Sequence, residues 1–334
     1  MRICCQILRI LYGTFRTLPE AVQKLHPMTA QRKGTGRMMH QISGFGRRAV
    51  IHDTGAELQS LRGGDGAELL WQGDPQWWSG RSPVLFPIVG RAKDDHLTVA
   101  GEPVVMAQHG FARRQTFRVI EAAEHHVLHE LTASDATLAA YPRRFRLRIE
   151  HRLTAEGLSI GAEVLNTDAR ALPFGLGFHP AFQWPLPGAE GAPHVINLGT
   201  GAEPLQNPLS GGLLRRDRTA SPFTQGRLAL EADLFRNDAL VFSEGAGEAL
   251  SYGPETGPQL RFRFENLPLI AFWTRPGAPF LCIEPWHGAA AWTDGGAALE
   301  DRPGTITLQP GETAGFAVHI DLQDFDAGRG AMGR

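Results

Sequence analysis

The clearest alternation of apolar and polar side chains in this chain runs over residues 146–153, with the sequence RLRIEHRL. Leu147, Ile149 and Leu153 fall on one face of an extended strand, because successive side chains point to opposite faces. The tripeptide Ala-Glu-Gly at 155–157 allows a tight connection to the next apolar-rich segment. The pattern predicts a β-hairpin with one buried face and one solvated face.

Many other short segments are rich in Val, Ile, Leu, Phe or Thr, and Gly, Pro, Asn and Asp separate them. The predicted strands span residues 47–51, 68–72, 116–121, 127–132, 145–153, 158–166, 228–230, 239–242, 259–264, 269–274, 281–284, 305–308 and 314–321. Amphipathic helical stripes of about twelve residues or more are almost absent from this part of the chain. We therefore predict a mainly β fold in which two large antiparallel sheets pack face to face.

The sequence predicts one domain and two terminal segments. Residues 1–38 hold seven Lys or Arg and one acid, Glu20, and we predict an N-terminal extension outside the folded domain. A transit-type or membrane-surface segment is the alternative. Residues 39–325 are predicted to form a single domain, and residues 326–334 a flexible tail. Residues 185–227 have little pattern and predict long loops at one end of the sandwich, where binding groups tend to collect.

Composition narrows the classes of function. The 33 Lys and Arg residues nearly balance 35 Asp and Glu, which gives no reason to expect nucleic acid as a partner. The three cysteines, Cys4, Cys5 and Cys282, are too few for a disulfide framework. No apolar run approaches the about eighteen residues of a membrane-spanning helix. We predict a cytoplasmic protein, a monomer or homodimer, with no membrane partner.

Two segments match functional motifs only loosely. Residues 44–49 (GFGRRA) fit a dinucleotide-binding pattern, but that pattern requires a following helix, and a strand is predicted here instead. This segment predicts a turn. Residues 125–129 (HHVLH) suggest a metal site, yet neither Cys nor a carboxylate completes a ligand set within the segment. We predict a polar surface strand there, and no metal site in the protein.

Three segments far apart in the chain each place a proton-handling side chain among Gly, Pro and aromatic residues. They are residues 108–113 (QHGFAR), 177–182 (GFHPAF) and 283–288 (IEPWHG). A carboxylate can remove a hydroxyl proton, an imidazole can return one, and a flat aromatic ring can lie against the C–H face of a sugar. The three segments together indicate acid–base chemistry on a sugar.

These segments are part of a wider resemblance to the aldose 1-epimerase (galactose mutarotase-like) family, and to the bacterial branch near the hexose-6-phosphate 1-epimerases. The resemblance covers about residues 45–322 and rests on an ordered set of motifs: GAEL at 55–58, LWQGD at 70–74, FPIVGR at 86–91, QHGFAR at 108–113, FHP at 178–180, NDAL at 237–240 and IEPW at 283–286. It implies a β supersandwich with an open sugar cleft on one sheet. It also implies an isomerase that interconverts the α and β anomers of a hexose or hexose derivative.

The chemistry can be followed through the candidate catalytic residues, Glu284 and His179. Opening a hemiacetal ring requires removal of the anomeric hydroxyl proton and protonation of the ring oxygen. A carboxylate with an ordinary pKa near 4.3 is ionised at neutral pH and can be the base, whereas a histidine near 6.5 can be the acid. Glu284 fits the base and, by analogy with the family, His179 fits the acid. No metal or organic cofactor is required.

The candidate substrate-binding residues are His109, Arg91, Asp238 and Trp286. We expect His109 to hydrogen-bond a sugar hydroxyl rather than to move the proton. Arg91 could clamp hydroxyls or a phosphate, or pair with Asp94 or Asp95. Asp238 could bind a hydroxyl or close a turn, and Trp286 could stack on the sugar or belong to the core.

Two other functions use the same residues. A carbohydrate-binding protein would hold a free or phosphorylated sugar in the same cleft without turnover. A glycosidase would use Asp238 and Glu284 as paired carboxylates and release a leaving group from a glycoside.

Overall fold

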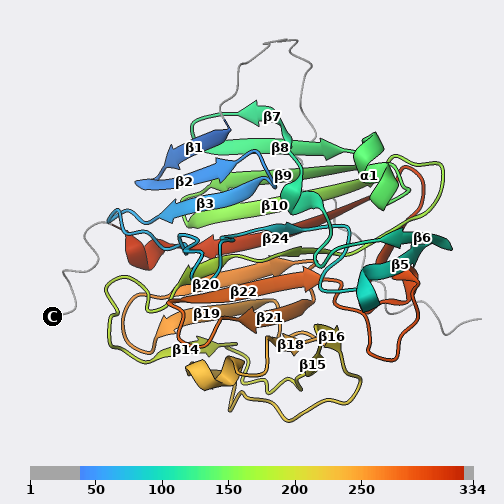
Figure 1. Ribbon diagram of the computed structural model, residues 1–334. Coiled ribbons are helices and arrows are strands. Elements are labelled where there is room, and N and C mark those ends of the chain that lie inside the picture. The colour runs from blue at the N-terminus through green and yellow to red at the C-terminus, as the bar shows by residue number, and fades with distance from the viewer. Residues whose placement is uncertain (1–37, 327–334) are drawn as a thin grey trace, which may run out of the picture. The chain divides into compact units, whose positions relative to one another are not determined.

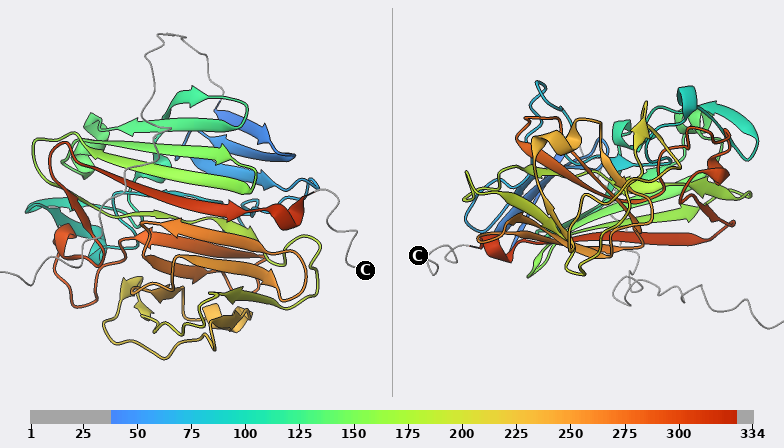
Figure 2. Two further views of the ribbon diagram at one scale, coloured as in Figure 1. Left: turned by 180° about the vertical axis from the view of Figure 1, so that it is seen from behind. Right: turned by 90° about the horizontal axis from the view of Figure 1, so that it is seen from below.

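The computed structural model describes residues 38–326, which fold mainly into antiparallel β-sheets (Figure 1). The nine strands of the largest sheet are, in spatial order, β17 (Arg227–Ala229), β14 (His194–Asn197), β19 (Ala249–Pro254), β20 (Leu260–Glu265), β24 (Thr313–Asp321), β10 (Gly157–Asn166), β9 (Phe145–Leu153), β8 (His126–Thr132) and β7 (Arg118–Ala122). Figure 2 shows this sheet from behind. A six-stranded sheet contains β18 (Leu240–Phe242), β21 (Leu269–Trp273), β22 (Phe280–His287), β12 (Leu176–Phe178) and β4 (Val84–Leu85), with β13 (Ala181–Gln183) paired to β22.

Smaller elements complete the fold. The other strands are β1 (Met39–Gly44), β2 (Arg47–His52) and β3 (Glu57–Arg62) in one sheet, and the pairs β5 (His96–Val99) with β6 (Glu102–Val105), β11 (Leu172–Phe174) with β23 (Ile306–Leu308), and β15 (Leu209–Ser210) with β16 (Leu213–Leu214). The described residues contain one α-helix, α1 (Asp135–Ala140). The 3₁₀ turns are Lys93–Asp95, Ala112–Arg114, Ala232–Phe235, Leu299–Asp301 and Gln323–Phe325.

The six-stranded sheet has one face toward the main core and one face away from it, and β22 shows how the sequence produces both. Leu281 and Ile283 join the main hydrophobic core, which also contains side chains of the nine-stranded sheet. Cys282 and Trp286 belong to separate apolar clusters. Since side chains alternate along a strand, Glu284 shares the face of Cys282 and Trp286. We call this face of the six-stranded sheet the outer face.

The three-stranded sheet packs on the part of the nine-stranded sheet that contains β8 and β9 (Figure 1). Ile42, Ala49 and Ile51 from its strands share the main core with Ile149 of β9. The predicted turn at 44–49 is confirmed: it joins β1 to β2 through two residues in the left-handed region, with φ of 56° at Phe45 and 76° at the glycine that follows. Such a turn matches the twist of the strands that it connects.

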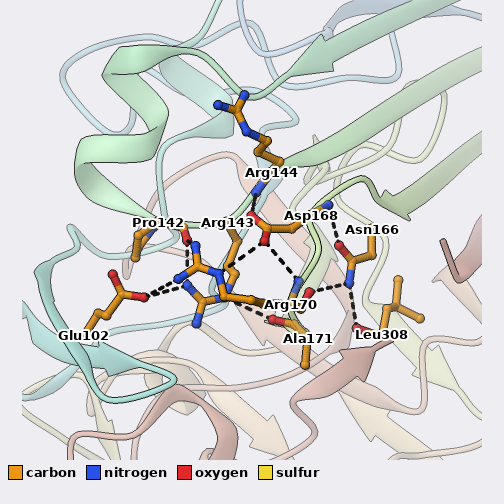
Figure 3. Close-up of polar contacts among 9 residues, drawn as sticks. All are labelled: Glu102, Pro142, Arg143, Arg144, Asn166, Asp168, Arg170, Ala171 and Leu308. Atoms are coloured by element: carbon orange, nitrogen blue, oxygen red, sulfur yellow. Dashed lines mark hydrogen bonds and ion pairs between the residues drawn. The ribbon is translucent and has the colours of Figure 1, made fainter. Parts of the chain in front are cut away.

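A polar network ties the β5–β6 hairpin to the segments before β9 and after β10 (Figure 3). The Arg143 guanidinium is 1% exposed and donates to Ala171 O at 3.1 Å and to Glu102 Oε1 at 2.8 Å. Arg170 donates to the same Glu102 oxygen at 2.8 Å and to Asp168 Oδ1 at 3.2 Å. A buried guanidinium requires such partners because burial removes its hydration. The network therefore holds three chain segments together.

The structure confirms the mainly β fold and its large antiparallel sheets. The predicted strand at 68–72 is wrong: Leu69, Leu70 and Trp71 are all buried, but the segment forms only isolated bridges at Glu68 and Leu70. Of the surface strand predicted at 125–129, residues 126–129 lie in β8, but His126 and His129 are buried there.

The N-terminal extension predicted for 1–38 and the tail predicted for 326–334 lie, except for residues 38 and 326, outside the described residues. The division of the chain into these segments and a single domain at 39–325 stays a prediction. Between residues 38 and 326, no helix combines the length and the apolar character that crossing a bilayer requires.

Candidate active site

The outer face of the six-stranded sheet carries a cavity of about 370 Å³, within the range of about 300–1,000 Å³ that is usual for small-molecule sites. Its aromatic lining consists of Trp78, Trp273 and Trp286, and its polar lining of Gln108, His109, Arg113, His179, Asp238, Arg275 and Glu284. The cavity thus combines flat apolar surfaces with many hydrogen-bonding groups.

Glu284 lies in the middle of β22, the strand of this sheet that pairs with β21, β12 and β13. Its side chain is 2% exposed, and its backbone is in register with Ala271 of β21. The small side chain of Ala271 leaves room beside the carboxylate on the outer face. A carboxylate in such a buried position is costly unless it is hydrogen-bonded or functional.

His179 follows directly after β12 and meets Glu284 across the cavity floor. The His179 Nε2 atom lies 3.2 Å from Glu284 Oε2. Trp78 stacks on the imidazole with ring centroids 4.9 Å apart, and Trp273 approaches it edge-on at 6.0 Å. The two indoles fix the plane of the imidazole. The structure thus brings together two residues that are 105 positions apart in the sequence, 284 minus 179.

His109 lies on the other side of His179, with ring centroids 5.6 Å apart. Its ring Nδ1 accepts a hydrogen bond from the Gly90 backbone N–H at 3.1 Å, and the backbone N–H of His109 donates to Gly90 O at 2.9 Å. A neutral imidazole that accepts at Nδ1 carries its proton on Nε2. His109 can therefore donate an Nε2–H hydrogen bond.

Gly110 allows this arrangement, since its φ is 68° and an added Cβ would stand 2.2 Å from Phe86 O. We expect Gly110→Ala to lower the free energy of unfolding by about 2–4 kcal/mol through backbone strain and overpacking. Denaturant unfolding would measure the loss. Gly161→Ala on β10 is the matched control, because a Cβ there meets nothing within 4 Å. Equal stability of the two variants would contradict the prediction.

Burial changes the charges of the site from those expected for free side chains. Desolvation raises the pKa of Glu284 well above its usual range, and the charge of Asp238 raises it further. Desolvation also lowers the pKa of His179 to about 3, with a smaller contribution from Arg113. The pKa of His109 is lowered well below its usual value by desolvation and then by His179. An attraction between charged Glu284 and His179 would have the opposite effect on both pKa values, but burial outweighs it.

The ordinary pKa values expected for a free carboxyl and a free imidazole therefore do not describe these two groups, because burial raises the pKa of Glu284 and lowers that of His179. Their roles as base and acid stay a prediction. Burial thus favours the protonated form of Glu284 and the neutral forms of the two imidazoles. Because His179 and Glu284 are in contact, their titrations belong to the pair rather than to either residue.

The structure places Asp238 and Trp286 in the cavity lining but leaves Arg91 out of it. The Arg91 Nε atom pairs with Asp95 Oδ1 at 3.0 Å, which is the alternative that the sequence left open. The exposed Asp238 has φ of 88°, and its Oδ1 also accepts from the Ala239 N–H at 2.8 Å. Trp286 is 5% exposed and belongs to an apolar cluster while also lining the cavity.

Several site residues were missed by sequence reasoning. Trp78, Trp273, Gln108 and Arg275 line the cavity, and none of them lies in a periodic pattern that separates it from the core. The pair of adjacent tryptophans at 77 and 78, in a loop rich in Gly, Pro and Ser, was the available signal.

Sequence reasoning also missed Arg302, a buried residue that supports a loop of the site. It is 6% exposed, and its Nη2 donates to Val89 O at 2.6 Å and to Ala289 O at 2.8 Å. These bonds hold the loop that contains Gly90, the partner of His109. The charge of Arg302 also contributes to the lowered pKa of His109. Sequence alone gave no signal for a role of this arginine.

Cys282 lies two residues before Glu284 on β22. Its Sγ atom lies close to ligand atoms of His179 and Glu284, and the three residues could hold a metal ion. Burial, and then the charge of Glu284, raise the pKa of the Cys282 thiol well above its usual value. A protonated thiol is a poor metal ligand. The positions of the Glu284 carboxyl group and the His179 imidazole are explained by their contact with one another.

Comparisons with known proteins show which family the chain belongs to. A model of the family described as aldose 1-epimerase matches residues 38–321. The plasmid-encoded protein LacX of Lactococcus lactis subsp. lactis is 29% identical over 284 residues, which cover 80% of this chain and 94% of that protein. A galactose mutarotase related enzyme from Lactobacillus acidophilus has a solved structure with a TM-score of 0.79 and 31% identity, covering 85% of this chain and 97% of that one.

A galactose mutarotase-like protein from Lactobacillus casei ATCC 334 is similar in structure as well, with a TM-score of 0.77 and 27% identity over 85% of this chain and 99% of that one. The family model spans nearly all of the described residues, and the solved structures share their mainly β architecture. The chain belongs to the aldose 1-epimerase family.

Proposed function

We propose that this protein is a mutarotase that interconverts the α and β anomers of a hexose or hexose derivative, with Glu284 as general base and His179 as general acid. The observation that carries the proposal is the contact between these two groups, with Nε2 and Oε2 3.2 Å apart in the floor of a cavity with tryptophan walls. Family membership favours the same reaction.

Unpartnered polar atoms around the cavity support a ligand with many hydroxyl groups. His179 Nδ1, Trp286 Nε1 and Arg113 Nε are buried and have no hydrogen-bond partner among the described residues. Buried polar atoms are rarely left unsatisfied in folded proteins. A sugar offers hydroxyls that both donate and accept, so it can satisfy such atoms, while its C–H faces lie against the indoles.

The reaction follows from the positions of these groups. Glu284 removes the proton from the anomeric hydroxyl, the bond between C1 and the ring oxygen breaks, and His179 protonates the ring oxygen. Rotation about the C1–C2 bond turns the other face of the aldehyde toward the ring hydroxyl. Ring closure then runs the two proton transfers in reverse, so the base becomes the acid and the acid becomes the base.

One proton on the Glu284–His179 pair is what this cycle needs at its start. In the free protein burial favours that proton on Glu284, because burial raises the pKa of Glu284 and lowers that of His179. Transfer of the proton to His179 produces the carboxylate base and the imidazolium acid together. His109, neutral and protonated on Nε2, contributes a hydrogen bond to a sugar oxygen.

An anomerisation assay tests the proposal. A freshly dissolved pure anomer is mixed with the protein, and its relaxation to the anomeric equilibrium is followed by polarimetry or NMR for a panel of free and phosphorylated hexoses. We expect at least one hexose to relax faster than it does spontaneously.

The same assay separates the two other functions. Saturable binding of a sugar without faster relaxation would indicate a carbohydrate-binding protein. Release of a leaving group from a glycoside, with no effect on free-sugar anomers, would indicate a glycosidase that uses Asp238 with Glu284. Either result would overturn the proposed function.

A further inference from the structure

A second cluster of chemically reactive side chains lies away from the cavity, where the three-stranded sheet packs on the nine-stranded sheet. It contains His40 of β1, Asp53 directly after β2, and His129 of β8. Figure 1 shows β1 beside β8. The sequence segment 125–129 had suggested a metal site that lacked a carboxylate. The fold supplies that carboxylate from a position 76 residues away.

The distances in the cluster fit ligands around one ion as well as they fit ion pairs. A single oxygen, Asp53 Oδ1, lies 2.9 Å from His40 Nε2 and 3.2 Å from His129 Nε2. Ligand atoms that share a zinc ion at bond lengths near 2.0–2.2 Å are roughly 2.9–3.5 Å apart. One ligand atom from each of the three residues lies within 4.8 Å of the other two.

Hydrogen bonding explains only part of this arrangement. His129 Nε2 makes a hydrogen bond with Asp53 Oδ1. His40 Nε2 is buried and has no partner in hydrogen-bond geometry among the described residues, although it is only 2.9 Å from the same oxygen. An imidazole nitrogen that approaches a carboxylate oxygen in this way is placed to share a cation with it.

The donor set and its surroundings indicate the class of cation. Two imidazole nitrogens and one carboxylate oxygen suit zinc and similar divalent first-row transition metals better than calcium or magnesium, which prefer oxygen ligands. The His129 side chain is 0% exposed, whereas those of His40 and Asp53 are 20% and 17% exposed. A metal ion can therefore enter from solvent, and water can complete its coordination.

We propose that His40, Asp53 and His129 bind a divalent first-row transition metal ion of the zinc class, and that this ion fastens the three-stranded sheet to the nine-stranded sheet. The site is separate from the sugar cavity and takes no part in the proton transfers there. His40 and Asp53 come from the three-stranded sheet, where β1 pairs with β2, and His129 comes from β8 of the nine-stranded sheet.

Zinc binding to the full chain tests this proposal. The protein is stripped of metal with a chelator, and Zn²⁺ is titrated in competition with a chromophoric indicator, with the melting temperature measured in parallel. We expect one zinc ion per chain and a higher melting temperature in its presence. His40→Ala and Asp53→Asn should each weaken binding at least about 100-fold and abolish the thermal shift.

Two control variants make the result specific. His125→Ala removes an exposed histidine next to the same strand and should bind zinc as the parent does. Cys282→Ser removes the thiol of the His179–Cys282–Glu284 group and should also leave binding intact. His40 is partly exposed, so its alanine variant is expected to fold and keeps the test valid if Asp53→Asn does not. No zinc binding, unchanged binding in His40→Ala, or loss of binding in Cys282→Ser would overturn the proposal.

Discussion

A Glu284→Gln variant is expected to interconvert sugar anomers about 10³–10⁴-fold more slowly than the parent protein, near the upper range for loss of a general base. Glutamine keeps the size of the side chain and its hydrogen-bonding oxygen but cannot accept the hydroxyl proton. At about 1.4 kcal/mol for each factor of ten, the change raises the barrier by roughly 4–5.5 kcal/mol. The rate of relaxation of a pure anomer is the measurement, and sugar affinity should change little.

Glu150→Gln is the matched control for this variant, because Glu150 lies on β9 of the other large sheet and does not line the cavity. The control should retain the parent rate. A Glu284→Gln protein that retains most of its rate would show that another group is the base. A variant that loses sugar binding along with the rate would show that Glu284 mainly holds the ligand.

His179→Gln is expected to lower kcat/KM by about 10²–10⁴-fold and to reverse its dependence on pH. In the parent protein the active pair carries one proton. That proton is lost as pH rises through the pKa of Glu284, which burial raises. The kcat/KM of the parent should therefore be level on the acid side and fall as pH rises. Without the imidazole only ionised Glu284 can act, so the residual rate should rise over the same pH range.

The pH profile of kcat/KM for both proteins is the measurement, with His96→Gln, an exposed histidine outside the cavity, as the control. A parent rate that increases with pH through the neutral range would mean that the unprotonated pair is the active form. If kcat/KM still falls as pH rises in His179→Gln, the proton that the reaction requires belongs to some other residue.

The long strands could be predicted from the sequence because one face of each is buried. β9 alternates over nine residues and β10 over nine of its ten, and a period of two is unambiguous over such lengths. β3 was missed because Leu58 and Leu61, both buried, are three residues apart. An irregularity in the pairing of β2 with β3 shifts the register there, and a sequence pattern does not show a bulge in advance.

The short strands β4, β12 and β13 of the six-stranded sheet were missed, and the reason is different. β4 has two residues, and β12 and β13 have three each. So few residues define no period, and all but one of these are buried. The strand expected at 68–72 was wrong for the related reason that a continuous apolar run indicates burial without indicating a ladder partner.

A residue of the candidate site could be predicted where its type is unusual among its sequence neighbours. A glutamate inside a run of buried apolar residues, as at Glu284, is such a case. His179 required the resemblance to a family, since a histidine beside Phe and Pro is common in cores. The protonation of both could not be predicted, because it depends on burial created by distant segments. The contact of Asp53 with His129 likewise depends on how the two sheets pack.

The two sides of the cavity are formed by segments that tolerate sequence changes to different degrees. Glu284 lies on β22, a strand inside the six-stranded sheet, whereas Leu209, Gly212 and Leu214 come from the small β15–β16 hairpin within the weakly patterned segment 185–227. Surface loops tolerate insertion and replacement far better than central strands do. During divergence, new sugar preferences can therefore arise by remodelling this hairpin, while the machinery that transfers protons is inherited unchanged.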